Sequence, residues 1–421
     1  MSDARRRAVE ALIPAAQRYP DVPAHAWDFS TLPPRDAALA MAIHRTVMQR
    51  WITLTYLLDG CLTQKSAQLE PRLRAVLLAG AAQVMFLDRL PDHAVVDESV
   101  SLARRLVRPG AAGLVNAVLR KLITRRGVGD DQPWRPDVQR LPLGAGGLAL
   151  REVALPPVEA VAHHLSVATS HPRRLVQRWI DVYGEAATAE LCLHNVMEPP
   201  TVVHEARSHR PWDQGHDELR AWLAAGPDRW VQDAASSRPV EATAGLAVAQ
   251  ALDYCAGRGT KSRQLAYQHP QARILATDVD EHRFASLREM AAAHERIDAV
   301  TPAEALARVG ECDLVVLDVP CSNTGVLARR PEARYRFDQS SLDKLINLQR
   351  QIVGEVLPHI RPGCHVLYAT CSLEREENQR QVSWITAHHP VDVVRDGMLM
   401  PSARGEVYHD GSFHALLRRR A

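Results

Sequence analysis

Apolar side chains recur at helical intervals through the first 125 or so residues. Leu73, Val76, Leu77, Val84 and Leu87 follow one another at roughly every third or fourth position. This spacing gathers apolar residues on one face of a helix. Strand-like alternation is scarce in this part of the chain, so the pattern predicts an all-α N-terminal helical bundle.

The pattern changes after Gln232, where short apolar runs alternate with amphipathic stretches. The runs predict strands over residues 251–254, 273–277, 314–317 and 365–368, with helices between them. Strands that alternate with helices form a parallel sheet with right-handed crossovers. The C-terminal part is therefore predicted to be an α/β, Rossmann-like domain.

Glycine and proline accumulate over residues 127–157, which is typical of a linker or an irregular crossing. Residues from Val158 to about Trp230 look like helices followed by a less regular stretch. The sequence thus predicts a multidomain chain divided into residues 1–130, 131–230 and 231–421. Its 421 residues, 46% of them hydrophobic, are enough for more than one core.

Composition indicates a cytoplasmic protein without a membrane span or a metal site. The longest apolar stretch, residues 75–87, is too short to cross a bilayer and contains Gly80 and Gln83. The arginines at positions 5–7 are not followed by the apolar core of a signal peptide. Seven cysteines without paired spacing indicate free thiols in a reducing compartment, and no CxxC or HxxxH cluster is present.

Charge gives weaker information about partners. The formal net charge of +2 is too small to indicate a nucleic-acid partner by itself. A local basic cluster follows position 100 and would suit a phosphate backbone, although a solvated helical face explains it equally well. Its members are Arg104, Arg105, Arg108, Arg120, Lys121, Arg125 and Arg126.

Two cysteines occupy similar positions after two of the predicted strands. Cys321 lies in Asp318-Val319-Pro320-Cys321-Ser322, and Cys371 lies in Ala369-Thr370-Cys371-Ser372. Open α/β sheets bind ligands at the carboxyl ends of their strands, so both thiols are expected to face one crevice. There a thiolate would attack carbon and a second group would help the adduct leave. A single cysteine is often an inert core residue, but the paired contexts favour chemistry.

The first two predicted strands carry features of a nucleoside site. The first strand runs into a glycine-bearing turn over residues 253–261 that leads into a helix. The second strand ends at Asp278, where an acid can accept both hydroxyls of a ribose. Because a full GxGxxG is missing, S-adenosylmethionine is favoured over a dinucleotide.

These segments resemble the RNA 5-methylcytosine methyltransferases. Residues 252–261, 317–325 and 368–378 look like the first, fourth and sixth motifs of that family. Residues 91–100 and 113–120 resemble the helical, antiterminator-like RNA-binding domain that precedes the catalytic domain in bacterial ribosomal RNA members. The resemblance covers most of the chain, with residues 231–234 and 410–413 near the two ends of the catalytic part. It implies a class I methyltransferase domain that acts on ribosomal RNA, with 16S rRNA as the expected target.

The resemblance also implies roles for individual residues. Cys371 would be the nucleophile that adds to C6 of cytosine, Asp318 would contact the ring edge around N3, and Cys321 would assist release of the product. S-adenosylmethionine would be held by Cys255, Ala256, Gly257, Arg258, Gly259, Thr260, Lys261, Asp278 and Asp318.

Two departures from the family pattern keep a second hypothesis open. Relatives carry Ala-Pro-Gly-Gly-Lys where this chain has Gly257-Arg258-Gly259-Thr260-Lys261, and residues 298–304 contain no clear equivalent of the Gly-Asp of the third motif. The alternative is a diverged paralogue that binds RNA or assists ribosome assembly without catalysis. The two cysteines in their full contexts favour the enzyme.

Overall fold

The chain folds into two compact units in a computed structural model that describes residues 3–23, 27–205, 208–226, 228–403 and 408–421. The first unit comprises Met1–Glu198 together with Leu327–Asp338, and the second comprises Pro199–Val326 together with Gln339–Ala421. The sequence places its boundaries near residues 130 and 230, whereas the compact units change over between Glu198 and Pro199. A short later segment, residues 327–338, also returns to the first unit.

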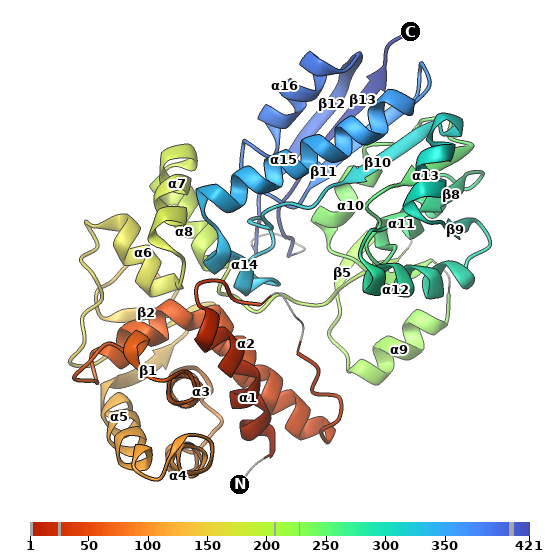
Figure 1. Cartoon of the computed structure of the whole chain (residues 1–421). Helices are drawn as coiled ribbons and strands as arrows, with labels where there is room; N and C mark the ends of the chain where they lie inside the picture. The colour runs from red at the N-terminus through yellow and green to blue at the C-terminus, as the bar shows by residue number, and fades with distance from the viewer. Residues whose placement is uncertain (1–2, 24–26, 206–207, 227, 404–407) are drawn as a thin grey trace. The chain divides into compact units, whose positions relative to one another are not determined.

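The first unit is mainly helical, as the apolar spacing predicts (Figure 1). Leu12, Trp51 and Leu77 have no exposed surface and belong to its core. Its helices are α1 (Asp3–Arg18), α2 (Pro34–Asp59), α3 (Pro71–Phe86), α4 (Asp92–Leu102), α5 (Ala111–Arg125), α6 (Val161–Thr169), α7 (Arg173–Tyr183), α8 (Glu185–His194) and α14 (Pro331–Arg336), with short helical segments η1 (Ser66–Gln68) and η2 (Ala103–Val107).

The glycine-rich stretch after α5 is an ordered antiparallel sheet and not only a linker. Its strands are β1 (Arg126–Asp130), β2 (Arg140–Leu143) and β3 (Gly146–Leu150), in the order β1-β3-β2. Glycine allows the backbones of neighbouring strands to lie close together here. A Cβ on Gly146 would overlap the carbonyl oxygen of Asp130 on the neighbouring strand. Glycine therefore marks strand contact here as well as a turn.

Arg334, on α14, is a buried cation that joins several elements of the first unit. Its guanidinium donates to the carbonyl oxygens of Asn195 at 2.8 Å and Leu327 at 3.1 Å. It also donates at 3.4 Å to three further carbonyls, those of Gln49, Thr169 and Ser170. The side chain has no exposed surface. Carbonyl oxygens at the ends of α6 and α8 are thus satisfied by one side chain.

The second unit starts with a small antiparallel sheet, where the sequence pattern is least regular. The sheet has the order β5-β4-β6, and its strands are β4 (Val202–Glu205), β5 (Ser208–Pro211) and β6 (Arg229–Val231). Helix α9 (His216–Ala224) lies between β5 and β6 in the chain.

The rest of the second unit is built on a seven-stranded sheet with the order β12-β13-β11-β10-β7-β8-β9. Strands β9, β8, β7, β10 and β11 pair in parallel, and β13 pairs antiparallel with both β11 and β12, so within this sheet β13 is the reversed strand. The strands are β7 (Gln250–Asp253), β8 (Arg273–Ala276), β9 (Ile297–Ala299), β10 (Leu314–Asp318), β11 (His365–Thr370), β12 (Val391–Leu399) and β13 (Ser412–Arg419). This confirms the predicted Rossmann-like domain.

Helices cover both faces of the large sheet, which explains the continuous apolar runs of its central strands. Val315 and Leu317 pack in one core cluster with Val353 of α15, whereas Leu314 and Val316 pack in the other with residues of α10, α11 and α12 (Figure 1). The helices are α10 (Ala234–Glu241), α11 (Thr260–Gln268), α12 (Glu281–Ala292), α13 (Pro302–Arg308), α15 (Gln339–Val356) and α16 (Gln379–His388), with η3 (Val309–Glu311) and η4 (Leu357–His359).

Among the described helices, none combines the length and the apolar character needed to cross a membrane.

Replacing Arg334 with methionine should destabilise the first unit. The substitution keeps an apolar stem but leaves buried carbonyl oxygens without their donor, at a cost of about 3 kcal/mol or more in the free energy of unfolding. Urea unfolding followed by tryptophan fluorescence measures the change. Arg336→Met is the matched control, because Arg336 lies on the same helix and pairs only loosely with Glu332, at 3.8 Å. Equal stability of the two variants would contradict the role assigned to Arg334.

Candidate active site

Neighbouring strands bring the two predicted cysteines together. Strands β10 and β11 pair in parallel with Asp318 opposite Ala369. Cys371 is the first residue after β11, and Cys321 follows the end of β10 by three positions. Their Sγ atoms are 3.3 Å apart. The expectation that both thiols face one place at the carboxyl edge of the sheet therefore agrees with this geometry.

The loop that follows β10 is shaped to meet Cys371. Asn323 has a left-handed backbone with φ of 60°, its side-chain amide donates to the carbonyl oxygen of Cys321 at 2.8 Å, and its Oδ1 accepts from the Cys371 thiol at 3.3 Å. The backbone N–H of Gly325 donates to the carbonyl oxygen of Cys371 at 2.9 Å. A Cβ on Gly325 would lie 2.8 Å from that oxygen, so the close approach requires glycine.

The two thiols differ in their surroundings. Cys321 is buried with 7% of its surface exposed, whereas Cys371 is half-buried. The hydrogen bond with Cys371, followed by burial and by the nearby charges of Cys371 and Glu377, raises the pKa of Cys321 well above its ordinary value. Cys321 is thus held as a thiol, and Cys371 is the more accessible sulfur for attack on a substrate.

One buried carboxylate, that of Glu377, joins the two cysteine loops. It accepts from the hydroxyl groups of both Ser322 and Ser372 at 2.5 Å, and from the backbone N–H of Ser322 at 2.9 Å. Gln349 on α15 donates to it at 2.9 Å. Each serine directly follows one of the two cysteines, so Glu377 fixes the backbone on both sides of the thiol pair.

Further hydrogen bonds hold Glu377 itself in place. The hydroxyl of Tyr368 donates to the Glu377 carbonyl oxygen at 2.7 Å, and Asn378 Nδ2 donates to the carbonyl oxygen of Ser372 at 2.8 Å. Glu377 has no exposed surface. Burial raises the pKa of Glu377, although its hydrogen bonds to Ser322, Ser372 and Gln349 act in the opposite direction. Among the described residues no cation pairs with this carboxylate, and its buried position is tolerated because it has several hydrogen-bond donors.

Lys261 and Asp318 form an ion pair at the ends of β7 and β10. Lys261 Nζ donates to Asp318 Oδ2 at 2.7 Å. Burial lowers the pKa of Lys261, but Asp318 outweighs it, with a further contribution from the charge of Cys371, and the net shift is upward. A permanent cation and a carboxylate therefore lie near the thiol pair.

The predicted cofactor loop leaves β7 as a tight turn into α11. The backbone N–H of Gly259 donates to the carbonyl oxygen of Ala256 at 2.9 Å, and both Gly257 and Gly259 have left-handed backbones, with φ of 59° and 87°. The space above the Cα of Gly257 is open, since an added Cβ would meet nothing within 4 Å. Arg258 and Thr260 are exposed, so the loop closes although arginine replaces the family's proline.

Asp278 and Asp253 support this loop. Asp278 Oδ2 accepts from the backbone N–H of Gly257 at 2.9 Å, and Oδ1 accepts from that of Asp280 at 2.9 Å. Both Asp278 oxygens keep a second lone pair for a ligand hydroxyl. The fully buried Asp253 accepts from Ser262 at 2.7 Å, and burial raises its pKa to about 7.

The structure thus places all the predicted site residues at or after the carboxyl ends of four strands, with Cys321 after β10 and Cys371 after β11. Cys255 to Lys261 follow β7, Asp278 follows β8, and Asp318 ends β10. Sequence reasoning missed the network of Glu377, Ser322, Ser372 and Gln349. Glu377 and both serines lie inside the recognised motifs, but their joint contact depends on the fold. Within the described residues, no group of three or more His, Cys, Asp or Glu side chains could hold a metal ion.

Replacing Glu377 with glutamine should loosen the thiol pair. Both oxygens of the carboxylate accept hydrogen bonds, whereas the NH2 group of the new amide would face donors and could not accept from them. We therefore expect the free energy of unfolding to fall by about 2–4 kcal/mol. Cys321, now protected by burial, should react faster with a maleimide, as followed by mass spectrometry under native conditions. Glu376→Gln is the matched control on the same loop, where Glu376 pairs with Arg380 at 3.0 Å. An E377Q variant with the stability and labelling rate of this control would refute the role given to Glu377.

Comparisons with known proteins agree with the strand order and the motifs. The family model described as 16S rRNA methyltransferase RsmB/F matches residues 247–404, and that of the NusB family matches residues 2–124. The chain is 31% identical to ribosomal RNA small subunit methyltransferase B of Xanthomonas campestris pv. campestris, covering 83% of this chain and 79% of that one. It is 29% identical to the protein of that name from Erwinia tasmaniensis, covering 91% and 90%.

A solved structure extends the likeness to the fold. The crystal structure of PH0851 has a TM-score of 0.69, is 17% identical, and covers 98% of this chain and 99% of that chain. At this level of identity the likeness concerns the fold alone. With the sequence matches and the paired cysteine motifs, the conclusion is that the chain belongs to the 16S rRNA methyltransferase RsmB/F family.

Proposed function

We propose that the protein methylates C5 of a cytosine in 16S ribosomal RNA, with S-adenosylmethionine as methyl donor and a covalent bond between Cys371 and C6 of the base. The observation that carries the proposal is the pair of thiols 3.3 Å apart at the ends of β10 and β11, beside the Lys261–Asp318 ion pair. Family membership supports the reaction class, and the geometry supports the division of labour among the residues.

The covalent step answers a chemical need. C5 of cytosine is a poor nucleophile, and addition of a thiolate at C6 turns the C5–C6 double bond into an enamine whose electron pair is available at C5. Cys371 is assigned this addition because it is the more exposed sulfur of the pair. Asp318 is assigned the ring edge around N3, where its carboxylate can accept a hydrogen bond from the N4 amino group. It can also accept from N3 once that nitrogen has taken up a proton, and this proton offsets the negative charge that develops during the addition. Lys261 holds the Asp318 carboxylate in place for that contact.

Release requires two bonds to break after the methyl group has been added. The proton on C5 must pass to a base such as water, and its electron pair then restores the C5–C6 double bond as the C6–S bond breaks and Cys371 departs as a thiolate. Cys321 is assigned to this stage because its sulfur adjoins that of Cys371. Its raised pKa keeps it as a thiol during the attack, so it does not compete as a nucleophile.

The residues of the cofactor loop fit S-adenosylmethionine, which supplies the transferable methyl group when bound. Gly257 leaves open space for a ligand at the carboxyl end of β7, and Asp278 has oxygens for ribose hydroxyls. Asp318 completes the set on the other side of the loop. We therefore keep Cys255 to Lys261, Asp278 and Asp318 as the proposed cofactor residues.

The alternative function is RNA binding without catalysis. It is motivated by the altered loop at residues 257–261 and by the third motif, where Asp298 lies within β9 and pairs with Arg273 at 3.4 Å. Detection of 5-methylcytidine, made by the purified protein on unmethylated 30S subunits or 16S rRNA, would exclude this alternative.

Replacing Cys371 with alanine should abolish methyl transfer while leaving cofactor binding intact. Loss of the nucleophile should lower the rate by several orders of magnitude. Calorimetric titration should still give a micromolar dissociation constant for S-adenosylmethionine, which corresponds to about 8 kcal/mol of binding. Cys61→Ala, in the first unit, is the control and should remain active. An active C371A variant would refute the proposed mechanism, and wild-type protein that binds no cofactor with RNA present would favour the non-catalytic alternative.

Replacing Cys321 with alanine should trap the reaction after attack. With release impaired, protein and RNA should stay joined through Cys371 and migrate together on a denaturing gel. The adduct should disappear in the C321A/C371A double variant, which is the matched control. If C321A turns over normally and leaves no adduct, Cys321 has only a packing role.

A further inference from the structure

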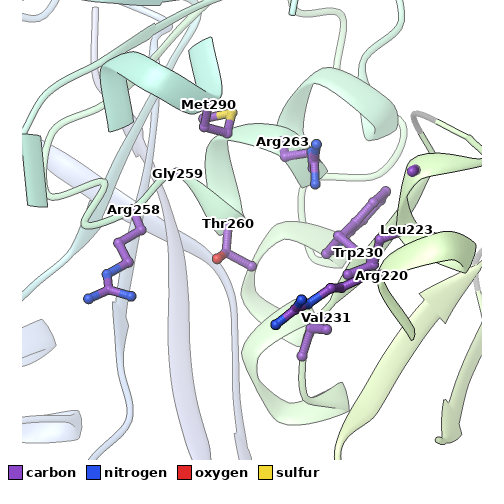
Figure 2. Close-up of a pocket in the computed structure, with 10 residues that line it drawn as sticks. Arg220, Leu223, Trp230, Val231, Arg258, Gly259, Thr260, Arg263 and Met290 are labelled. Atoms are coloured by element: carbon purple, nitrogen blue, oxygen red, sulfur yellow. The ribbon is translucent and has the colours of Figure 1, made fainter. Parts of the chain in front are cut away.

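A cavity lies against the cofactor loop. It has a volume of about 490 Å³ and is formed by α9, β6, the start of α11 and the side chain of Met290 from α12 (Figure 2). It shares Arg258, Gly259 and Thr260 with the loop, but Lys261, Asp278 and Asp318 do not line it. The acidic side chains assigned to the cofactor are therefore not part of the lining of this cavity.

Three arginines make this cavity cationic. Arg220 comes from α9, Arg258 from the loop and Arg263 from α11, and Figure 2 shows Arg258 and Arg220 on opposite sides of Thr260. Within the part of the chain that the structure describes, Arg220 has a single loose ion pair, with Asp217 at 4.0 Å, and both side chains are largely exposed. The buried Nε of Arg263 has no hydrogen-bond partner among the described residues, and burial lowers the pKa of this group. Guanidinium groups whose hydrogen-bond donors are not fully used favour an anionic ligand.

The floor of the cavity is apolar and firmly held. Val231 is an exposed large hydrophobic residue, with 44% of its surface open, next to Trp230. Trp230 Nε1 donates to Gln232 Oε1 at 2.6 Å, and Gln232 Nε2 donates to Gln264 Oε1 on α11 at 2.7 Å. These bonds tie β6 to α11, so the walls are fixed before any ligand arrives.

We infer that this cavity binds a single-stranded segment of the RNA substrate next to the target cytosine, with phosphate groups on Arg220 and Arg263 and a base against the Val231 floor. The inference rests on the proposed function, because it takes RNA as the substrate. Arginine clusters bind phosphates, and apolar or aromatic surfaces accept the faces of unstacked bases. An acidic protein segment would match the positive charge of the arginines, but it would have no base to cover the apolar floor.

The test compares two double variants with the same change in net charge. R220Q/R263Q removes the two cavity arginines that lie outside the cofactor loop, and R273Q/R288Q removes two exposed arginines that do not line the cavity. The probes are an unstructured oligocytidylate and unmethylated 16S rRNA, and binding is measured by fluorescence anisotropy over a range of salt concentrations. Cofactor affinity is measured on the same proteins by calorimetry.

We expect R220Q/R263Q to bind both RNAs roughly 10- to 100-fold more weakly than R273Q/R288Q. The slope of log K against log salt should fall in magnitude by about 1.4, because each lost contact to single-stranded phosphate is worth about 0.7. The dissociation constant for S-adenosylmethionine and the unfolding midpoint should stay as in the control. With saturating RNA, the rate of methyl transfer should recover, so the defect should lie in KM.

Two results would overturn the inference. Equal RNA affinity of the two variants would show that the cavity does not bind RNA. A selective loss of binding to polyglutamate, titrated as a third probe in the same assay, would then assign the cavity to an acidic protein segment. A loss of cofactor affinity in R220Q/R263Q would make the cavity part of the cofactor site. RNA binding is measured without turnover, so a wild-type protein that makes no 5-methylcytidine refutes the proposed function while the RNA comparison still decides the inference.

Discussion

The buried carboxylate of Glu377 is the constraint on which the site geometry depends. Parallel pairing of β10 and β11 brings two strand ends together, but strand pairing alone does not fix the loops beyond them. Glu377 accepts from Ser322 in one loop and Ser372 in the other, and each serine adjoins a cysteine. The 3.3 Å separation of the sulfurs is therefore supported by Glu377, which bonds to neither cysteine, together with Asn323, which bonds to both. A network of this kind is rigid when all its members are satisfied, because each missing bond would leave a buried polar atom.

This constraint also separates the chemistry of the two thiols. The hydrogen bond with Cys371 and burial raise the pKa of Cys321 most, and the nearby negative charges of Cys371 and Glu377 add to the shift. Cys371, by contrast, lies near the Lys261 ammonium, and its charge contributes, after that of Asp318, to raising the pKa of the lysine. Two identical side chains thus receive different electrostatic surroundings. Such a difference suits a reaction in which one sulfur must attack and the other must wait as a thiol.

Periodicity in the sequence is enough to place the central strands, because residues buried on both faces form short continuous apolar runs. The predicted run at residues 314–317 corresponds to β10 (Leu314–Asp318), and the cysteine contexts lead directly to the thiol pair. The hydrogen-bond network around Glu377 could not be derived in this way. Gln349 reaches Glu377 from α15, and nothing in its local sequence distinguishes it from an exposed helical glutamine. Glycine gave an ambiguous pattern: over residues 126–150 it permits close strand contact, which composition cannot separate from a turn.

The chain connects this site to the first unit in a way that sequence reasoning did not foresee. Val326 closes the loop that begins with Cys321, and the next residue, Leu327, already belongs to the first unit. Four residues later the chain enters α14, where Arg334 donates to carbonyl oxygens of residues 49, 169, 170 and 195. A fragment that began at Pro199 would lack all four of these acceptors and would expose a guanidinium that is now fully buried. The first unit therefore supplies the acceptors that hold Arg334, in the segment that follows the loop after β10.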